Sequence, residues 1–403
     1  MTLTAVAPAR PRSISRALIP LGLVFLAVGL STALVLPFLS LFLSTEVHAG
    51  PVKVTVFLVA APLAGVLSSS LVGRLSDRWP IRRWILCGAA LAGVAGTALT
   101  AVVRDYWVLL GLAVTATALA NALFPQTFAY ARQVLERDSP GRSAIGISAM
   151  RTVFSLAWVA GPPIGAFVLD FGGFRLVYGL AAVMYALAAL IAALGLENVA
   201  APAPAAVEPD AGPAAPPAPA TRGVLRLTAL AFVLLQVPMT LAVQALPLFV
   251  DRNLHRSASD AGVILGLCAA LEIPIMLGLG ALTTRFRLRT LVLAGGACGV
   301  AYYAAALVTP NIWVLGVAQV ANALFIAAVS GVGISYMQDL LPGEPGRATT
   351  MFTNTFPIGA VVAGPLLGVA AQIGYRSAYG MATALCGAGL LLLILAHPAG
   401  RRR

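Results

Sequence analysis

The sequence predicts an all-α membrane protein in which twelve transmembrane helices form two pseudo-symmetric six-helix bundles. Three observations support this fold class: the composition, a series of long apolar runs and an internal repeat. Of the 403 residues, 60% are hydrophobic and only 10% are charged, with a mean hydropathy of +0.92. A soluble domain carries roughly a quarter charged residues. The composition therefore excludes a soluble core of this length and indicates a polytopic membrane protein.

Apolar runs of about 20 residues recur along the chain, which is the length that crosses roughly 30 Å of hydrocarbon as a helix. The runs do not alternate apolar and polar residues as the strands of a membrane barrel do. We therefore expect helices, with spans near residues 17–43, 54–73, 84–103, 106–131, 144–169, 174–196, 224–250, 260–283, 290–308, 312–338, 348–371 and 377–396.

Basic residues are distributed unequally over the loops between these spans. If the N-terminus is cytoplasmic, 19 arginines fall on the cytoplasmic side and 6 basic residues on the other, while Arg151 lies inside the fifth span. Loops rich in Lys and Arg remain in the cytoplasm, so we expect both termini there. The net charge of +12 then reflects topology. No nucleic-acid partner is predicted, because the arginines are spread over separate loops.

The chain divides at residues 197–222 (ENVAAPAPAAVEPDAGPAAPPAPATR), whose Ala/Pro-rich composition is typical of a flexible linker. We expect this linker to be cytoplasmic. The predicted parts are a tail at 1–16, a six-helix bundle at 17–196, the linker, a second bundle at 223–396 and a basic tail at 397–403.

The two halves repeat each other. ANALF occurs at 120–124 and 321–325, PGR at 140–142 and 345–347, and AGPPIG at 160–165 corresponds to AGPLLG at 363–368. The order and spacing are conserved between the halves, which chance matches in apolar sequence would not maintain. Two parallel six-span repeats are the architecture of a transporter that binds its substrate near the midplane between the halves.

Several kinds of chemistry are not supported. Cys87, Cys268, Cys298 and Cys386 are isolated in apolar runs without metal-ligand spacing. The chain has no paired catalytic carboxylates, no histidine cluster and no phosphate-binding loop for ATP. We expect no metal, no cofactor and no enzymatic activity.

One loop of the sequence carries a motif that resembles that of a known superfamily. GRLSDRWPIRR at 73–83 resembles the motif between spans two and three of the major facilitator superfamily, although Pro80 and Ile81 replace its usual Gly and Arg. The resemblance implies a cytoplasmic latch that opens when the halves move. Its residues would be Gly73, Asp77, Arg78 and Arg82. The matching loop of the second half has Thr284 in place of the aspartate.

Longer strings resemble one family of that superfamily. LPFLSLFLSTEV (36–47), ALANALFPQTFAYAR (118–132), SAMRTVFSLAWVAGPP (148–163), GLCAALEIPIM (266–276) and YMQDLLPGEPGRATTMFTNT (336–355) are similar to the sugar efflux transporter (SET) family. The resemblance implies a monomer in the lipid bilayer of the bacterial inner membrane. It would export sugars or glycosides by alternating access, in antiport with protons. The alternative is a multidrug or other small-molecule exporter of the same fold.

A sugar site needs amides and carboxylates for the hydroxyl groups and an aromatic ring for the apolar face. The spans expected to line the cavity supply Asn121, Gln126, Trp158, Gln236, Gln244, Glu272, Asn322 and Asn354. The alternative for each amide is that it bonds a neighbouring helix.

Arg151 and Glu272 are the two charges predicted within the spans proper, one in each half. An ionised carboxylate in hydrocarbon costs at least ~2–3 kcal/mol, so Glu272 must be paired, protonated or in contact with substrate. Spans five and eight are expected to meet at the boundary between the halves. We therefore predict an interdomain pair or a proton-coupling site, with a purely structural ion pair as the alternative.

Overall fold

The computed structural model describes residues 14–79, 81–138, 143–197, 221–342 and 344–396. All regular structure in these ranges is helical, as predicted. The linker at 197–222 and the tails at 1–16 and 397–403 lie outside the described residues except at their edges.

The first half is a succession of helices that follows the predicted spans. It consists of α1 (Ile14–Val35), η1 (Leu36–Phe38), α2 (Leu39–Thr45), α3 (Pro51–Arg78), α4 (Arg82–Val102), α5 (Tyr106–Leu112), η2 (Ala113–Thr117), α6 (Ala118–Ala120), α7 (Leu123–Asp138) and α8 (Ser143–Gly195). Asp105 caps α5 by accepting hydrogen bonds from the backbone amides of Trp107 and Val108.

Helix α8 crosses the membrane twice. Its 53 residues would extend about 80 Å as one straight helix, far more than the ~30 Å of hydrocarbon. The backbone leaves helical geometry at Gly172 and Gly173, and Gly173 has a φ of 67°, which a residue with a side chain rarely adopts. Eleven helices in the described residues are long and apolar enough to span a membrane, and α8 accounts for the twelfth crossing.

The second half repeats this arrangement. It consists of α9 (Arg222–Leu254), α10 (Ala258–Leu282), α11 (Leu288–Val308), α12 (Ile312–Ile326), η3 (Ala327–Val332), α13 (Gly333–Leu340), α14 (Pro345–Thr353), α15 (Thr355–Ile373) and α16 (Arg376–Leu395). The stretches η2 and η3 are π-helical and interrupt the fourth and tenth spans.

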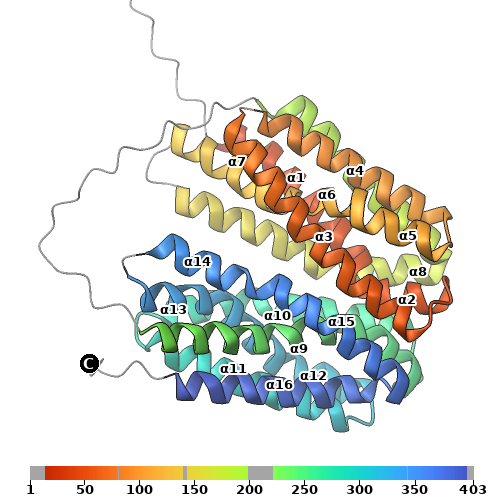
Figure 1. The fold of residues 1–403 in the computed structure, drawn as a ribbon, viewed down its shortest axis with the longest axis vertical. Coiled ribbons are helices and arrows are strands. Elements are labelled where there is room, and N and C mark those ends of the chain that lie inside the picture. Colours follow the sequence, from red (N-terminus) through yellow and green to blue (C-terminus); the bar gives the residue numbers. More distant parts are fainter. Residues whose placement is uncertain (1–13, 80, 139–142, 198–220, 343, 397–403) are drawn as a thin grey trace, which may run out of the picture.

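Each half forms its own bundle, and Figure 1 shows the first (red to yellow-green) lying above the second (green to blue). One apolar core is built entirely from residues 225–393 and another entirely from residues 21–196. A third core joins the halves and includes Phe38, Leu58 and Ala166 of the first with Leu241 and Leu367 of the second. The halves are therefore separate packing units that share one interface.

That interface lies at the end of the bundles remote from the chain ends. Helix α8 packs on α10, and α3 packs on α15. In Figure 1, α2 and the end of α15 come together at the right, whereas α16 ends at the left. The structure is thus closed between the halves at the face that carries the loops near residues 46–50 and 255–257.

Candidate functional site

The closed interface is made by helices that approach at small residues. A Cβ atom at Gly262 of α10 would lie 2.6 Å from the carbonyl oxygen of Pro162, and one at Gly266 would lie 2.4 Å from Cγ of Pro163. The same device recurs where a Cβ at Gly364 of α15 would lie 3.1 Å from Cβ of Leu58. Small residues four apart let membrane helices pack closely by dispersion contact. The backbones of α8 and α10, and those of α3 and α15, are therefore in close contact.

A hydrogen bond also connects the two halves. The Ser40 hydroxyl donates a 2.5 Å hydrogen bond to the backbone carbonyl of Gln244, 204 residues away. Near these residues the repeats align at an offset of 207, because LSLFL at 39–43 corresponds to LPLFV at 246–250, so the counterpart of Ser40 is Pro247. The bond therefore joins α2 to α9 at positions that are not equivalent in the two halves.

Pro162 and Pro163 belong to the AGPPIG string of the fifth span, and proline weakens the backbone hydrogen bonding of a helix. Their backbone angles are helical, because the non-helical residues within α8 are Gly172 and Gly173. The two prolines provide the surface on which Gly262 and Gly266 pack.

Glu272 lies on α10 beyond this interface, toward the face of the chain ends. Gly262 lies against both Pro162 and Ala166, and Gly266 against both Val159 and Pro163, so the helices are antiparallel. Continuing this register places Glu272 level with residue 155. The backbone of Arg151 is then about one helical turn, roughly 6 Å, farther along α8.

The environment of Glu272 can be read from its neighbours on the same helix face. Cys268, Glu272 and Met276 are spaced by four residues and so share one face of α10. Cys268 contacts Asn322 of α12, and Met276 lies against Gly331 of η3. The half-buried Glu272 is therefore beside the junction of α12 and η3. A π-helical stretch leaves backbone groups free of regular pairing and often occurs at functional sites.

Asn322 belongs to a buried polar chain within the second half. Its amide donates to Gln319 Oε1 at 2.9 Å and to Cys268 Sγ at 3.3 Å, and the Gln319 amide donates to the Tyr302 hydroxyl at 3.2 Å. These bonds connect α10, α11 and α12. They correspond to the helix-bonding alternative for Asn322, and they place its amide against Cys268, one turn before Glu272 on α10.

Three other predicted amides are buried and incompletely bonded. Gln126 on α7, and Gln236 and Gln244 on α9, are each less than 5% exposed. Among the described residues, Gln126 Oε1, Gln236 Nε2 and Gln244 Oε1 have no hydrogen-bond partner. A buried polar atom without a partner costs about 1–3 kcal/mol. A water molecule or polar ligand that reached one of these atoms would recover that free energy.

The remaining candidates are more accessible. Asn121 is exposed and its amide nitrogen lies against Gly65, where a Cβ would approach it to 2.6 Å. Trp158 on α8 is half-buried, and the exposed Asn354 occupies the break between α14 and α15.

The predicted latch occupies the turn from α3 to α4. The guanidinium of Arg82 is buried and donates to the Ser76 hydroxyl at 3.3 Å, while Arg78 is exposed. A Cβ at Gly73 would lie 4.0 Å from the amide nitrogen of Gln126. The side chain of Asp77 lies outside what the structure describes.

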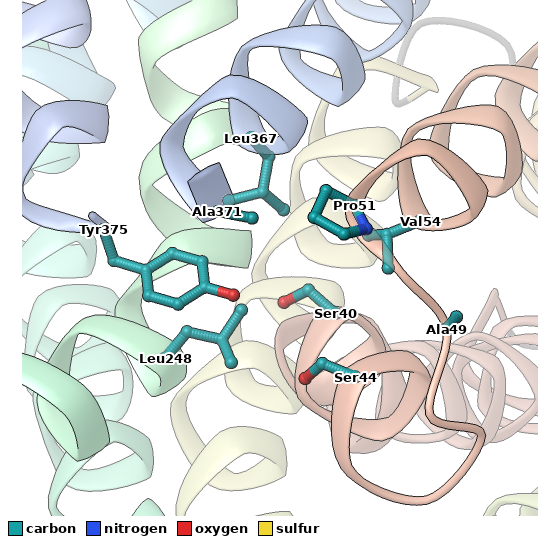
Figure 2. A pocket seen from close by; sticks show the side chains of 9 residues that line it. All are labelled: Ser40, Ser44, Ala49, Pro51, Val54, Leu248, Leu367, Ala371 and Tyr375. Atoms are coloured by element: carbon teal, nitrogen blue, oxygen red, sulfur yellow. The ribbon is translucent and has the colours of Figure 1, made fainter. Parts of the chain in front are cut away.

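A cavity of about 150 Å³ lies between the halves at the closed end. Ser40 and Ser44 line it from α2, and Tyr375 lines it from the start of α16 (Figure 2). Partial burial raises the pKa of the Tyr375 phenol above its ordinary value, an effect that the nearby Arg252 opposes. The phenol is therefore a hydrogen-bond donor at neutral pH. Sequence reasoning missed this cavity, although Ser40 and Ser44 are four residues apart in a quoted motif.

Comparison with known proteins shows which proteins share this organisation. The chain matches the family described as Major Facilitator Superfamily over residues 21–286 and 228–403. It is 34% identical to sugar efflux transporter A of Dickeya chrysanthemi, with 89% of this chain and 90% of that protein covered. It is 31% identical to sugar efflux transporter C of Escherichia coli (strain K12), with 92% and 94% covered.

The fold has a clear counterpart among solved structures. The crystal structure of the D323A mutant of the nucleoside transporter NupG superposes with a TM-score of 0.75, covering 94% of this chain and 98% of that chain. The sequence identity is 12%, so this likeness concerns the fold alone.

Proposed function

Because the chain belongs to the sugar efflux transporters of the Major Facilitator Superfamily, we propose that it exports sugars or glycosides from bacteria by alternating access. Alternating access requires two rigid halves that close at one end of the substrate path while the other end opens. The separate cores of the halves and their shared core at one end support this mechanism. An exporter of drugs or other small molecules is the competing assignment.

The orientation follows from the charges. With both termini and the 197–222 linker in the cytoplasm, the closed end faces away from the cytoplasm in the inner membrane. The structure then represents the state that receives substrate from the cytoplasm. A cysteine introduced into the linker should resist labelling by an impermeant maleimide in intact cells. Labelling from outside would contradict the orientation.

The proposed sugar site combines amides from both halves with one aromatic ring and one carboxylate. Its residues are Asn121, Gln126, Trp158, Gln236, Gln244, Glu272, Asn322 and Asn354. The observation that carries this assignment is the set of buried, unpaired amide atoms on Gln126, Gln236 and Gln244. Ligand hydroxyls would form hydrogen bonds with these amide atoms, whereas a drug pump needs a mainly apolar and aromatic cavity.

Proton coupling is proposed for Glu272 with Arg151. In the structure the two backbone positions differ by about one turn along the packed helices α10 and α8. When the halves approach at this depth, the arginine stabilises the carboxylate. When they separate, desolvation favours the neutral acid, which takes up a proton. Proton uptake would thus accompany one change of state, and proton release the reverse change.

The loop residues Gly73, Asp77, Arg78 and Arg82 complete the proposal as a latch on the cytoplasmic face. The buried Arg82 is bonded to Ser76 within its own loop, which would hold the turn in shape. We propose that this turn engages the opposite half when the cytoplasmic end closes.

The test is transport by the purified monomer in liposomes. Counterflow with labelled mono- and disaccharides should be saturable and unaffected by cationic drugs, and a pH gradient should drive sugar uphill. Competition by drugs without sugar counterflow would favour the competing assignment. Glu272→Gln should retain counterflow and lose uphill transport. Glu46→Gln is the matched control, because Glu46 pairs with Arg104 at 3.1 Å within the first half.

A further inference from the structure

A second cavity lies in the second half, at the face that carries the chain ends. Its volume is about 520 Å³, on the order of seventeen times the share of one liquid water molecule. Its walls are the first turns of α9, the residue that follows α13 and the start of α14. It shares no lining residue with the cavity at the closed end, and none of the eight residues of the proposed sugar site lines it.

The polar part of this pocket is mainly cationic. Arg222 and Arg226 are four residues apart on one face of α9, and Arg347 lies opposite on α14. Glu344 neutralises part of the charge through a 2.8 Å ion pair with Arg347. Within the described ranges, Arg222 and Arg226 neither donate a side-chain hydrogen bond nor form an ion pair. The pocket therefore has a surplus of two guanidinium groups.

The backbone adds to this positive potential. Helix α9 begins at Arg222, and its N-terminus carries the positive end of the dipole of a 33-residue helix. No atom comes within 4 Å of the position where Gly223 would carry a Cβ, so a ligand can approach the first turn closely. Arginines beside a helix N-terminus match the charge and geometry of a phosphate group.

The remaining lining is apolar, from Leu225, Leu341 and Met351. The depth of the pocket also favours an amphiphilic ligand. Helix α9 is about 50 Å long, so it exceeds the ~30 Å hydrocarbon layer by roughly 10 Å at each end. The arginines of its first turns are then at the depth of lipid headgroups, where basic pockets between helices bind anionic lipids.

We propose that this pocket binds the phosphate group of an anionic ligand. Arg222 and Arg226 hold the phosphate oxygens, and the apolar side chains contact the carbon skeleton that bears the phosphate. A phospholipid headgroup and a soluble phosphate ester offer the same chemistry, and the binding experiment separates them.

The experiment measures thermal unfolding of the full-length chain in detergent during three titrations. The ligands are a short-chain phosphatidylglycerol, a phosphatidylcholine of equal chain length and inorganic phosphate. A saturable rise in the unfolding temperature with phosphatidylglycerol identifies a lipid site. A saturable rise with inorganic phosphate identifies a soluble anion site. Equal rises with the two lipids and no response to phosphate would overturn the proposal.

Variants localise the site. Arg222→Gln with Arg226→Gln should weaken the effective ligand about 30-fold, which corresponds to about 1 kcal/mol for each arginine. Arg222→Lys with Arg226→Lys retains both charges and should keep most of the affinity. Its unfolding temperature without ligand shows whether substitution at these positions disturbs folding. Arg285→Gln with Arg287→Gln removes the same charge from an exposed loop of the same face and should change nothing. Equal weakening by both neutralised pairs would show diffuse charge attraction and refute the pocket.

Discussion

The substitution Gly262→Ala tests whether the close approach of α8 and α10 holds the two halves together in this state. In Gly262→Ala, the added methyl would lie 2.4 Å from Cβ of Ala166 and 2.6 Å from the carbonyl oxygen of Pro162. Because the second contact is with backbone, no side-chain rotation relieves it. Helices α8 and α10 must move apart, and overpacking of this kind costs about 1–3 kcal/mol.

That cost applies only while the halves are closed at this end. The substitution should therefore lower the ratio of this state to the opposite one by between about fivefold and 150-fold. Gly278→Ala on the same helix is the matched control, because no atom lies within 4 Å of its Cβ position. Both substitutions gain about 1 kcal/mol of helix propensity, so that gain cancels in the comparison.

The assay is a pulsed electron paramagnetic resonance distance between spin labels at Val52 and Ile373, which are 70% and 69% exposed on opposite halves. Gly262→Ala should transfer population from the short distance to a longer one, and Gly278→Ala should match the parent. An unchanged distance distribution in Gly262→Ala would refute the reasoning. A shift of the same size in the control would refute it as well.

Other outcomes follow from the site. Arg151→Ala should reduce sugar export at least tenfold and shift the unfolding temperature little, measured by counterflow and thermal unfolding; the opposite pattern would make it a structural residue. Asn322→Ala leaves Gln319 Oε1 without its donor, and should cost about 0.6–1.7 kcal/mol of stability. An unchanged denaturation midpoint would contradict this. Tyr375→Phe keeps the ring and removes the hydroxyl directed into the closed-end cavity, and should alter export rate without changing the amount of folded protein. Unaltered rates would exclude that hydroxyl from the path.

The sequence by itself determined the fold class, the number of crossings and the two-fold repetition. These properties depend on local composition, because each span must be apolar over the thickness of the bilayer and must satisfy its own backbone hydrogen bonds. The predicted boundary between spans five and six falls where Gly172 and Gly173 break α8. The types of polar side chain in the candidate site could also be predicted from the sequence, because an amide or carboxylate within an apolar span is easily recognised.

Only the tertiary structure decided which surfaces meet. Apolar spans look alike to one another, and the helix contacts depend on where backbones approach within van der Waals distance. The structure assigns that role to Gly262, Gly266 and Gly364, and Pro162 and Pro163 form the packing surface for the first two. It also shows the Asn322 amide bonded within one half. The physical reason is that hydrogen bonding and close packing between helices are non-local, whereas insertion into the bilayer is a property of each segment.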